Sequence, residues 1–515
     1  MRNRRGIRWA VFVSLALAGI GGGCEAQAAG SDQDTRASLL RDLQALAGDE
    51  MEGRGLGQPG LERALDYAAG ALQRARTEPG YRPREGSPTF LHPVPLVRYE
   101  YGGGIRAVIR QRGRRWEAGH GDDLVLLAPG SRVRDVPPAP PVFVGYGVSE
   151  PERGWDDYEG LDVRGRLLIM YESWYPTLPA ELQAEYADPA VGGVRRARAA
   201  EAHGAAGIIV IPHPAVFRQW DLIVGSRREG TFVAARDYAV QAPMDSPFPV
   251  VALSRTALEA LFADSGFDPL TPETDYRRFS LEGVEVALEL DVTRSPHTSH
   301  NAVGMVPGTD PGLAGEVIVV SAHIDHLGMV AGEIFNGAND DASGSVQVLE
   351  LARRFARNPA PRSVLFTLFT AEEWDHLGSI HLLEEFPVPG VEVVGSVNLE
   401  HMGRSGDGTL LATADGTLLP LVEAVASGRG QGRLRAQPLE TPRVIMGSDS
   451  YSFLQHRIPF VIIGGGTFPE YHTPGDDVDL IDLDLLTDGV ELVEELVRRM
   501  AGELVAVGAG PGVTA

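Results

Sequence analysis

The stretch VIVVSAHIDH, residues 317–326, joins a short apolar run directly to a cluster of histidine and aspartate side chains. Such an apolar run is typical of a strand buried on both faces of a parallel sheet. Similar runs follow at Val364–Phe369, Val393–Val397 and Phe460–Ile463, and Ser343–Phe355 carries apolar residues at helical spacing. This alternation predicts an α/β fold with a mostly parallel central sheet flanked by helices.

Acidic or histidine residues follow each of the four predicted strands. In open α/β sheets, sites form in the crevice outside the carboxyl ends of the strands. We therefore expect four separate segments of the chain to converge on one edge of the sheet. The residues concerned are His323 to His326 after the first strand, Glu372 and Glu373 after the second, Glu400 and His401 after the third, and His472 after the fourth.

Cysteine and net charge restrict the chemistry that this chain can carry out. The only cysteine is Cys24, so neither a disulfide framework nor a thiolate zinc site is available, and any metal site must be built from histidine and carboxylate. The formal net charge is -24, which argues against nucleic acid or anionic lipid as a partner.

The residues at the predicted sheet edge meet the needs of a site for two divalent metal ions. Hydrolysis of an amide by two metals requires a bridging carboxylate, a histidine and a carboxylate to complete each metal, and an open position for water. Asp340 is assigned as the bridge. His323 and Glu400 then complete one metal, and Glu373 and His472 complete the other.

Glu372, the neighbour of Glu373, is left free by this assignment. A free carboxylate beside the metals can take a proton from the attacking water and pass it to the leaving amine, so Glu372 is predicted to be the general base. Asp325 is expected to contact the second ring nitrogen of His323. Four further residues are interpreted as structural: His326, His376, Asp449, and His401, which is expected to point away from Glu400.

Several motifs together carry a resemblance to a known family. They are His323–Gly328, Asn336–Gly344, Ala371–Glu373 and Tyr471–Asp477, with Met51–Arg54 and Ser299–Val303. In order and spacing they resemble the co-catalytic zinc aminopeptidases of secreted bacterial type, a group that includes glutamate carboxypeptidase, glutaminyl cyclase and the transferrin receptor. The resemblance implies a zinc exopeptidase fold, peptide substrates, two Zn²⁺ ions on the ligands assigned above, and an oxyanion contact from Tyr471.

One departure and several alternatives accompany this resemblance. Many members have Asp-Met-x-Gly after the third strand, where this chain has Glu400-His401-Met402-Gly403, so the geometry and metal preference at Glu400 are open. A carboxypeptidase, a glutaminyl cyclase or a non-catalytic binding protein would share the same fold. Zincin proteases and nucleophile-elbow hydrolases are disfavoured, because neither His-Glu-x-x-His nor Gly-x-Ser-x-Gly occurs.

The remaining sequence suggests five segments. Residues 30–130 are predicted to be the first part of the peptidase domain, with helices at Thr35–Leu46 and Leu61–Ala75, and residues 291–505 its main part. Residues 131–290 resemble an inserted protease-associated domain through Val142–Tyr146, Arg164–Leu168 and Ala199–Ile208, with strands and a helix expected there at Leu167–Tyr171, Val194–His203 and Gly207–Ile211. A last helix is expected at Leu483–Val505, followed by a flexible tail at 506–515.

Residues 1–29 are predicted to be an export signal. Four arginines precede an apolar run at Trp9–Ile20, which is too short to span a bilayer. Two processing sites compete: Ala26-Gln27-Ala28 fits signal-peptide cleavage, and the residues before Cys24 resemble a lipoprotein box, which the solitary cysteine favours. The sequence thus predicts an exported bacterial protein, periplasmic, anchored to the outer membrane through Cys24, or secreted, with no integral membrane span.

Overall fold

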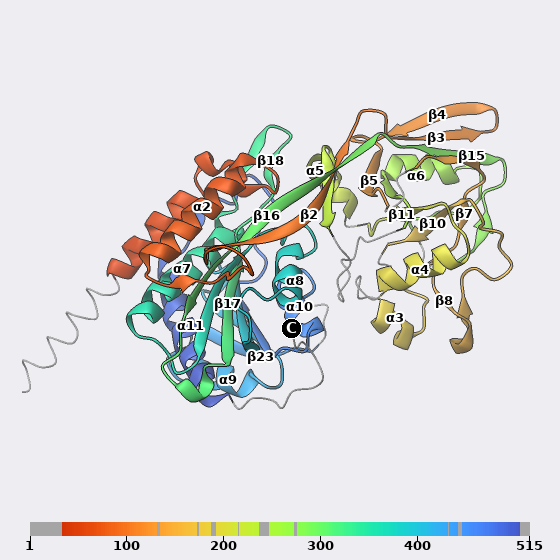
Figure 1. Ribbon diagram of the computed structural model, residues 1–515. Helices are drawn as coiled ribbons and strands as arrows, with labels where there is room; N and C mark the ends of the chain where they lie inside the picture. The colour runs from red at the N-terminus through yellow and green to blue at the C-terminus, as the bar shows by residue number, and fades with distance from the viewer. Residues whose placement is uncertain are drawn as a thin grey trace, which may run out of the picture.

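The computed structural model describes residues 33–504 except 131–133, 173–174, 187–191, 215, 236–246, 272–275, 431 and 441–444. The chain forms two lobes that are joined by a long ribbon of two antiparallel strands, β2 (Leu91–Tyr101) and β16 (Val292–Val306) (Figure 1). The predicted export signal with Cys24 and the predicted tail lie outside the described residues. Within the described ranges, no helix has both the length and the apolar composition needed to cross a bilayer.

The centre of the larger lobe is the sheet that the sequence predicts. The four expected strands lie next to one another in the order β20-β17-β21-β24, and all three pairings are parallel. Their side chains are buried almost throughout, which explains why the strands are apolar on both faces. The bounds are β17 (Glu316–His323), β20 (Ser363–Phe369), β21 (Glu392–Glu400) and β24 (Phe460–Gly464).

Antiparallel strands extend this parallel centre on both sides. On one side β16 pairs antiparallel with β20, and β2 and then β12 (Gly230–Ala234) continue the sheet. On the other side β22 (Leu410–Ala414) runs antiparallel to β24 and carries β23 (Leu434–Pro438). The predicted α/β class is confirmed, but the sheet is mixed outside its centre. A short strand, β1 (Glu78–Pro79), also pairs with β16.

Helices cover both faces of the central sheet. Alternate residues of β17 divide between the two layers: Ile318 and Val320 pack into one core, and Val317 and Val319 pack into the other. The first core contains residues of the helix at 33–46, of α2 (Pro59–Arg74), α7 (Ser343–Arg357), α9 (Leu419–Ser427) and α11 (Leu483–Glu503). The second contains residues of α8 (Leu377–Glu384) and α10 (Ser450–Gln455).

The smaller lobe has hydrophobic cores of its own. A six-stranded sheet has the order β14-β7-β10-β11-β13-β5, and a four-stranded sheet has the order β4-β3-β15-β6. The bounds are β3 (Arg106–Gln111), β4 (Arg114–Gly119), β5 (Leu124–Ala128), β6 (Val136–Ala139), β7 (Val142–Phe143), β8 (Ser149–Glu150), β9 (Trp155–Asp156), β10 (Leu167–Tyr171), β11 (Gly207–Ile211), β13 (Val250–Leu253), β14 (Phe279–Ser280), β15 (Val284–Glu289), α3 (Ala180–Tyr186), α4 (Val194–Ala202) and α6 (Arg255–Phe262).

The smaller lobe begins earlier than the sequence suggested. Strands β3 to β5, at 106–128, pair with β15, β6 and β13, so they belong to this lobe although they precede the predicted boundary at residue 131. The Pro-rich stretch that was chosen as a boundary lies in β6, which is paired only with β15 at the edge of the four-stranded sheet. Edge strands tolerate proline, which explains the misplacement.

One segment of the inserted region returns to the larger lobe. Helix α5 (Trp220–Arg227) contacts β5 of the smaller lobe and also β18 (Gly328–Val330) of the larger lobe, a strand that pairs with β19 (Glu333–Phe335) in a hairpin. Strand β12, which follows α5 in the chain, pairs with β2. The Arg227 guanidinium lies 4.0 Å from the centre of the Trp374 ring. Trp374 follows Glu373 directly, so the inserted region reaches the predicted site.

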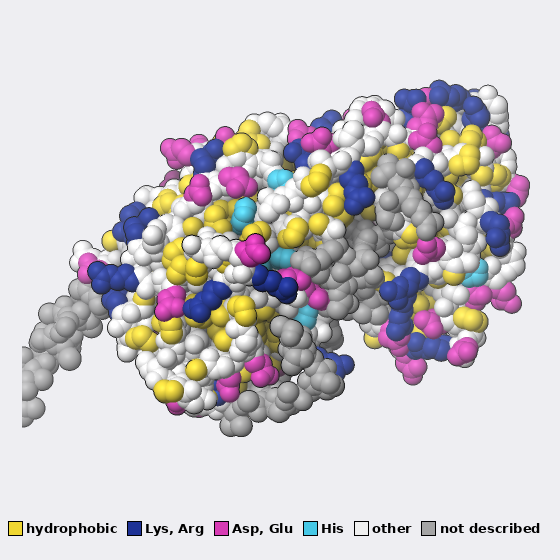
Figure 2. All heavy atoms as spheres, in the orientation of Figure 1, with side chains coloured by type: hydrophobic (Ala, Val, Ile, Leu, Met, Phe, Trp, Pro, Cys, Tyr) yellow, Lys and Arg dark blue, Asp and Glu magenta, His cyan; other side chains and the backbone are white. Residues whose placement is uncertain are grey.

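Charged side chains of both signs cover the surface. On the face drawn in Figure 2, Arg side chains lie scattered among Asp and Glu over both lobes, and histidine side chains reach the surface of the larger lobe. No single basic patch gathers on that face among the described residues, in keeping with the net charge of -24.

Arg54 lies at the base of the predicted site and is fully buried. Its guanidinium donates hydrogen bonds to four backbone carbonyls, those of Leu46 (2.7 Å), Ile324 (2.7 Å), Asn336 (2.6 Å) and Gly337 (2.9 Å). One side chain therefore ties the first helix to the two loops that carry His323 and Asp340.

We expect Arg54→Met to lower the free energy of unfolding by about 3 kcal/mol or more, because several buried carbonyls would lose charged donors. Chemical denaturation of the metal-free protein measures this change. The matched control is Arg63→Met on α2, whose side chain is 43% exposed and should matter little. Equal stabilities of the two variants would contradict the structural role of Arg54.

Candidate active site

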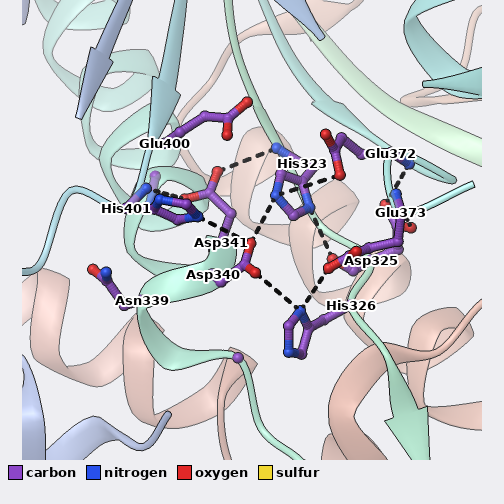
Figure 3. Close-up of polar contacts among 12 residues, drawn as sticks. His323, Asp325, His326, Asn339, Asp340, Asp341, Glu372, Glu373, Glu400 and His401 are labelled. Carbon is purple, nitrogen blue, oxygen red and sulfur yellow. Dashed lines mark hydrogen bonds and ion pairs between the residues drawn. The ribbon is translucent and has the colours of Figure 1, made fainter. Parts of the chain in front are cut away.

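The predicted site residues meet at the carboxyl edge of the parallel strands (Figure 3). His323 and Glu400 are the last residues of β17 and β21, and Glu372 and Glu373 follow β20. Asp340 lies in the turn Ala338–Ala342 just before α7. His472 comes from the loop after β24 and reaches the same place.

The turn that carries Asp340 is held by backbone contacts. The buried carboxylate of Asp476 accepts hydrogen bonds from the backbone N–H groups of Asn339 (2.9 Å) and Asp340 (3.0 Å). Gly337 has φ +57°, and a Cβ there would lie 2.3 Å from the Asp340 carbonyl, so this position requires glycine. The Asn-Gly-Ala-Asn-Asp motif thus encodes one fixed orientation of the Asp340 carboxylate.

Asp340 presents its two oxygens to two different groups of imidazoles. Oδ1 lies 3.2 Å from His323 Nε2 and 3.4 Å from His401 Nε2. Oδ2 lies 3.2 Å from His472 Nε2 and 3.7 Å from His326 Nδ1. Ligand atoms about 2.0–2.2 Å from a tetrahedral zinc are separated by about 3.4 Å, so the spacings of His323, His401 and His472 from Asp340 are those of neighbouring zinc ligands.

Glu373 belongs to the second of these groups. Its Oε2 lies 3.2 Å from His472 Nε2, and its Oε1 accepts a hydrogen bond of 2.9 Å from His326 Nδ1. His326, Asp340, Glu373 and His472 offer four potential ligand atoms that all lie within 4.8 Å of one another. The donor set of imidazole and carboxylate suits zinc.

Glu372 lies beside the metal-binding groups without belonging to either. Its carboxylate is buried, with Oε2 4.0 Å from His323 Nε2 and Oε1 3.3 Å from His376 Nε2. Burial, together with the neighbouring carboxylates of Glu400 and Glu373, raises the pKa of Glu372 well above its usual value, against the opposing effect of His323. A carboxyl with a raised pKa is suited to exchange protons near neutral pH.

Asp325 acts differently from the expectation. Its carboxylate accepts hydrogen bonds from the backbone N–H groups of Glu372 (3.0 Å) and Glu373 (3.4 Å). The second nitrogen of His323, Nδ1, instead donates to the backbone carbonyl of Asp325 at 3.0 Å. The prediction of a carboxylate–imidazole contact is therefore wrong, although the carbonyl does direct His323 Nε2 towards Asp340. Burial raises the pKa of Asp325 to about 7.

Glu400 and His401 also differ from the expectation. The backbone turns at His401, which has φ +55°, and its ring points towards Asp340, so this residue, interpreted as structural, lies among the candidate site residues. The Glu400 carboxylate is directed away from Asp340 in Figure 3 and accepts a hydrogen bond of 2.8 Å from Asn398 Nδ2. Within the described part of the chain, no histidine nitrogen lies within 4.0 Å of the Glu400 carboxylate.

Sequence reasoning missed two further contacts. His326, interpreted as structural, contacts Glu373, and its spacing of three residues from His323 was the available signal. His376, also interpreted as structural, contacts Glu372. It has φ +59°, an uncommon conformation for a residue other than glycine. Burial lowers the pKa of His376 to about 4, so its imidazole is neutral at neutral pH.

Aromatic rings form one side of the site. Tyr471 stacks on His472 with ring centres 3.9 Å apart, and 38% of its surface is exposed. Phe468 packs edge-on against both His401 and Tyr471, at 5.3 Å and 5.8 Å. These contacts fix the two imidazole rings while leaving an apolar surface beside the metal-binding groups.

Comparison with known proteins finds similarity to peptidases. Residues 301–497 match the sequence family described as Peptidase family M28. An aminopeptidase of Pseudomonas aeruginosa is 27% identical over 194 residues, which is 36% of this chain and 34% of that protein. The first curated relatives are matched over 11% to 60% of their own length, so the chain spans less than two thirds of each.

Solved structures share the fold over nearly the whole chain. The aminopeptidase from Aneurinibacillus sp. strain AM-1 has a TM-score of 0.56 at 20% identity, covering 92% of this chain and 96% of that one. A zinc aminopeptidase from Bacillus subtilis has a TM-score of 0.53 at 17% identity, covering 91% and 95%. At these identities the likeness concerns the fold, including both lobes.

Metal binding should release protons from the site. In the metal-free protein, burial lowers the pKa of His472 and His401, but neighbouring carboxylates outweigh it and raise these pKa values to about 10 and about 9. Both imidazoles are protonated at pH 7 and must lose their protons beside a divalent cation. We expect calorimetric heats of zinc binding at pH 7 to depend on the ionisation enthalpy of the buffer, and affinity to increase with pH. Heats that are equal in two such buffers would contradict this assignment.

Proposed function

We propose, from the Peptidase family M28 domain that residues 301–497 form, that this chain is a zinc-dependent aminopeptidase acting on peptides. The names of the relatives and structural neighbours, which are aminopeptidases, support this proposal. The observation that carries it is the position of Asp340, whose two oxygens face separate imidazole groups with a free glutamate beside them.

The proposed metal ligands follow from that arrangement. Asp340 would be shared by two zinc ions, with His323 available to one of them and Glu373 and His472 to the other. His326 donates a hydrogen bond to the remaining oxygen of Glu373 and orients it. The sequence assigned Glu400 as a further ligand next to His323, but its carboxylate contacts Asn398.

Each protein group then has a definite part in the reaction. Two zinc ions, when bound, supply polarisation of the scissile carbonyl and acidification of the attacking water. Glu372 takes the proton from that water and delivers it to the departing amine. Asp325 holds the backbone of Glu372 and Glu373 through two N–H contacts, so that one carboxylate ligates while the other stays free.

The charge of the site suits a substrate with a free amino terminus. Glu372, Glu400 and Asp449 are buried around His323, and burial raises the pKa of Asp449 to about 8. An ammonium group of a peptide amino terminus can take the place of the protons that these crowded acids hold, whereas a terminal carboxylate would add to the repulsion among them. This favours an aminopeptidase over a carboxypeptidase on the same fold.

Export remains part of the proposal. The basic and apolar residues of 1–29 support transfer out of the cytoplasm of a bacterium, with Cys24 as a candidate lipid attachment site. The inserted region is proposed to act as a protease-associated domain that borders the substrate path, because Arg227 stacks on Trp374 next to Glu373.

The role of Glu372 can be separated from that of its neighbour. We expect Glu372→Gln to lower kcat by about 10²–10⁴-fold while zinc content stays unchanged, because the general base is not a ligand. Glu373→Gln is the matched control, and it should lose zinc. Elemental analysis with amino-acyl anilide kinetics measures both, and loss of zinc in Glu372→Gln alone would mean that the two roles are exchanged.

The direction of attack can be tested with end-blocked peptides. We expect hydrolysis of a peptide amidated at its carboxyl terminus and none of the same peptide acetylated at its amino terminus, because the acetyl group removes the ammonium charge. Mass spectrometry of the products identifies the released residue. Cleavage of the acetylated peptide alone would overturn the aminopeptidase assignment. If the protein binds no zinc and cleaves neither peptide, the proposal that it is an enzyme is wrong.

A further inference from the structure

We propose that His401, and not Glu400, is the third protein ligand of the metal that His323 binds. The inference rests on the proposed two-metal site and concerns which residue completes it. It makes the two metal positions chemically unequal: the first has two imidazoles and the shared carboxylate, and the second has one imidazole, Glu373 and the shared carboxylate.

The spacing of the atoms carries this inference. His323 Nε2 and His401 Nε2 lie 3.2 Å and 3.4 Å from the same oxygen, Asp340 Oδ1. Both distances match the separation of about 3.4 Å between ligands of a tetrahedral zinc. The second metal position shows the same spacing, since His472 Nε2 lies 3.2 Å from both Asp340 Oδ2 and Glu373 Oε2.

The backbone fixes His401 in this position. Its N–H donates to Asp341 Oδ1 at 3.1 Å, and its carbonyl accepts from the N–H of Gly465 at 3.1 Å. With φ +55°, the residue ends β21 and turns the ring inward. Phe468 and Tyr471 pack edge-on against the ring at 5.3 Å and 5.5 Å, so few other rotamers have room.

Glu400 is held elsewhere by a chain of polar contacts. Asn398 Nδ2 donates to Glu400 Oε1 at 2.8 Å, and Ser321 Oγ donates to Asn398 Oδ1 at 2.7 Å. Asn398 Nδ2 also lies 3.2 Å from Ser448 Oγ. Together these contacts hold the carboxylate apart from Asp340, beyond the Asp341 carboxylate in the view of Figure 3.

The ligand sets predict different metal preferences. Imidazole nitrogens suit zinc, copper and nickel, whereas carboxylates also accept harder ions such as manganese. The position with two imidazoles should therefore bind zinc first. The position with two carboxylates should exchange its zinc for manganese more easily.

The test compares His401→Asn with Glu400→Gln by zinc content after dialysis against a fixed free-zinc concentration. Asparagine tolerates a left-handed backbone but cannot reach the metal, and glutamine keeps the size of Glu400 without its charge. We expect two zinc ions per chain in the wild type and in Glu400→Gln, and one in His401→Asn. Cobalt substitution gives a second readout, because the absorption bands of one cobalt site should vanish in His401→Asn.

Each outcome decides the inference. Two zinc ions in His401→Asn, or one in Glu400→Gln, would overturn it. The Glu400→Gln result is decisive even if His401→Asn does not fold, which circular dichroism reports. The proposed aminopeptidase activity is tested independently of the ligand assignment: it is wrong if the wild-type protein binds two zinc ions and hydrolyses no amino-acyl anilide.

Discussion

The fixed carboxylate of Asp340 is the constraint on which the site depends. It lies in a turn whose N–H groups are taken by Asp476 and whose carbonyls at Asn336 and Gly337 are taken by Arg54. Attraction by Asp340 and Asp476 partly offsets the cost of burying the Arg54 guanidinium. If Asp340 is shared by two metal ions, as proposed, its carboxylate has to be held in one orientation, and the buried Arg54 contributes to holding it.

Acidic side chains outnumber basic ones at the site, which favours the binding of cations. Burial raises the pKa of Glu400 and Asp449, while the imidazoles around Asp340 hold the pKa of its carboxyl well below the usual range despite burial. Without metals, protons on His323, His401 and His472 balance part of this charge. A divalent cation can replace such protons with little movement of the backbone, because the potential ligand atoms of His326, Asp340, Glu373 and His472 already lie within 4.8 Å of one another.

The sequence was sufficient to predict the centre of the fold and the convergence of most of the candidate site residues at one edge of the sheet. Buried parallel strands are apolar throughout, so β17, β20, β21 and β24 could be recognised, and the polar residues at their ends had to converge. The antiparallel flanks were not predictable in this way, because β2 and β12 carry a weaker pattern and pair with partners far along the chain. The start of the smaller lobe was misplaced because the Pro-rich stretch taken as a boundary lies in an edge strand, where proline is tolerated.

The errors in the site have a common cause. The side chains of Glu400 and His401 were expected to point to opposite faces of one strand, but β21 ends at Glu400. His401 has a positive φ, which the sequence does not indicate because the residue is not a glycine. Asp325 was expected to act through its side chain, whereas its carbonyl contacts His323. Backbone conformation at single residues decides both cases, and residue type alone does not specify it. The presence of His323, Asp340, Glu373 and His472 in one cluster did not depend on such details.

The pairing of β12 with β2 bears on how this architecture can change. Strand β12 comes from the inserted region but lies at the edge of the larger lobe's sheet, so the two lobes are interlaced instead of merely linked. Excising or exchanging the smaller lobe at its two ends would strip the catalytic sheet of its outermost strand and leave the backbone of β2 open to other chains. Natural or designed recombination of the lobes therefore has to carry β12 over with the catalytic half.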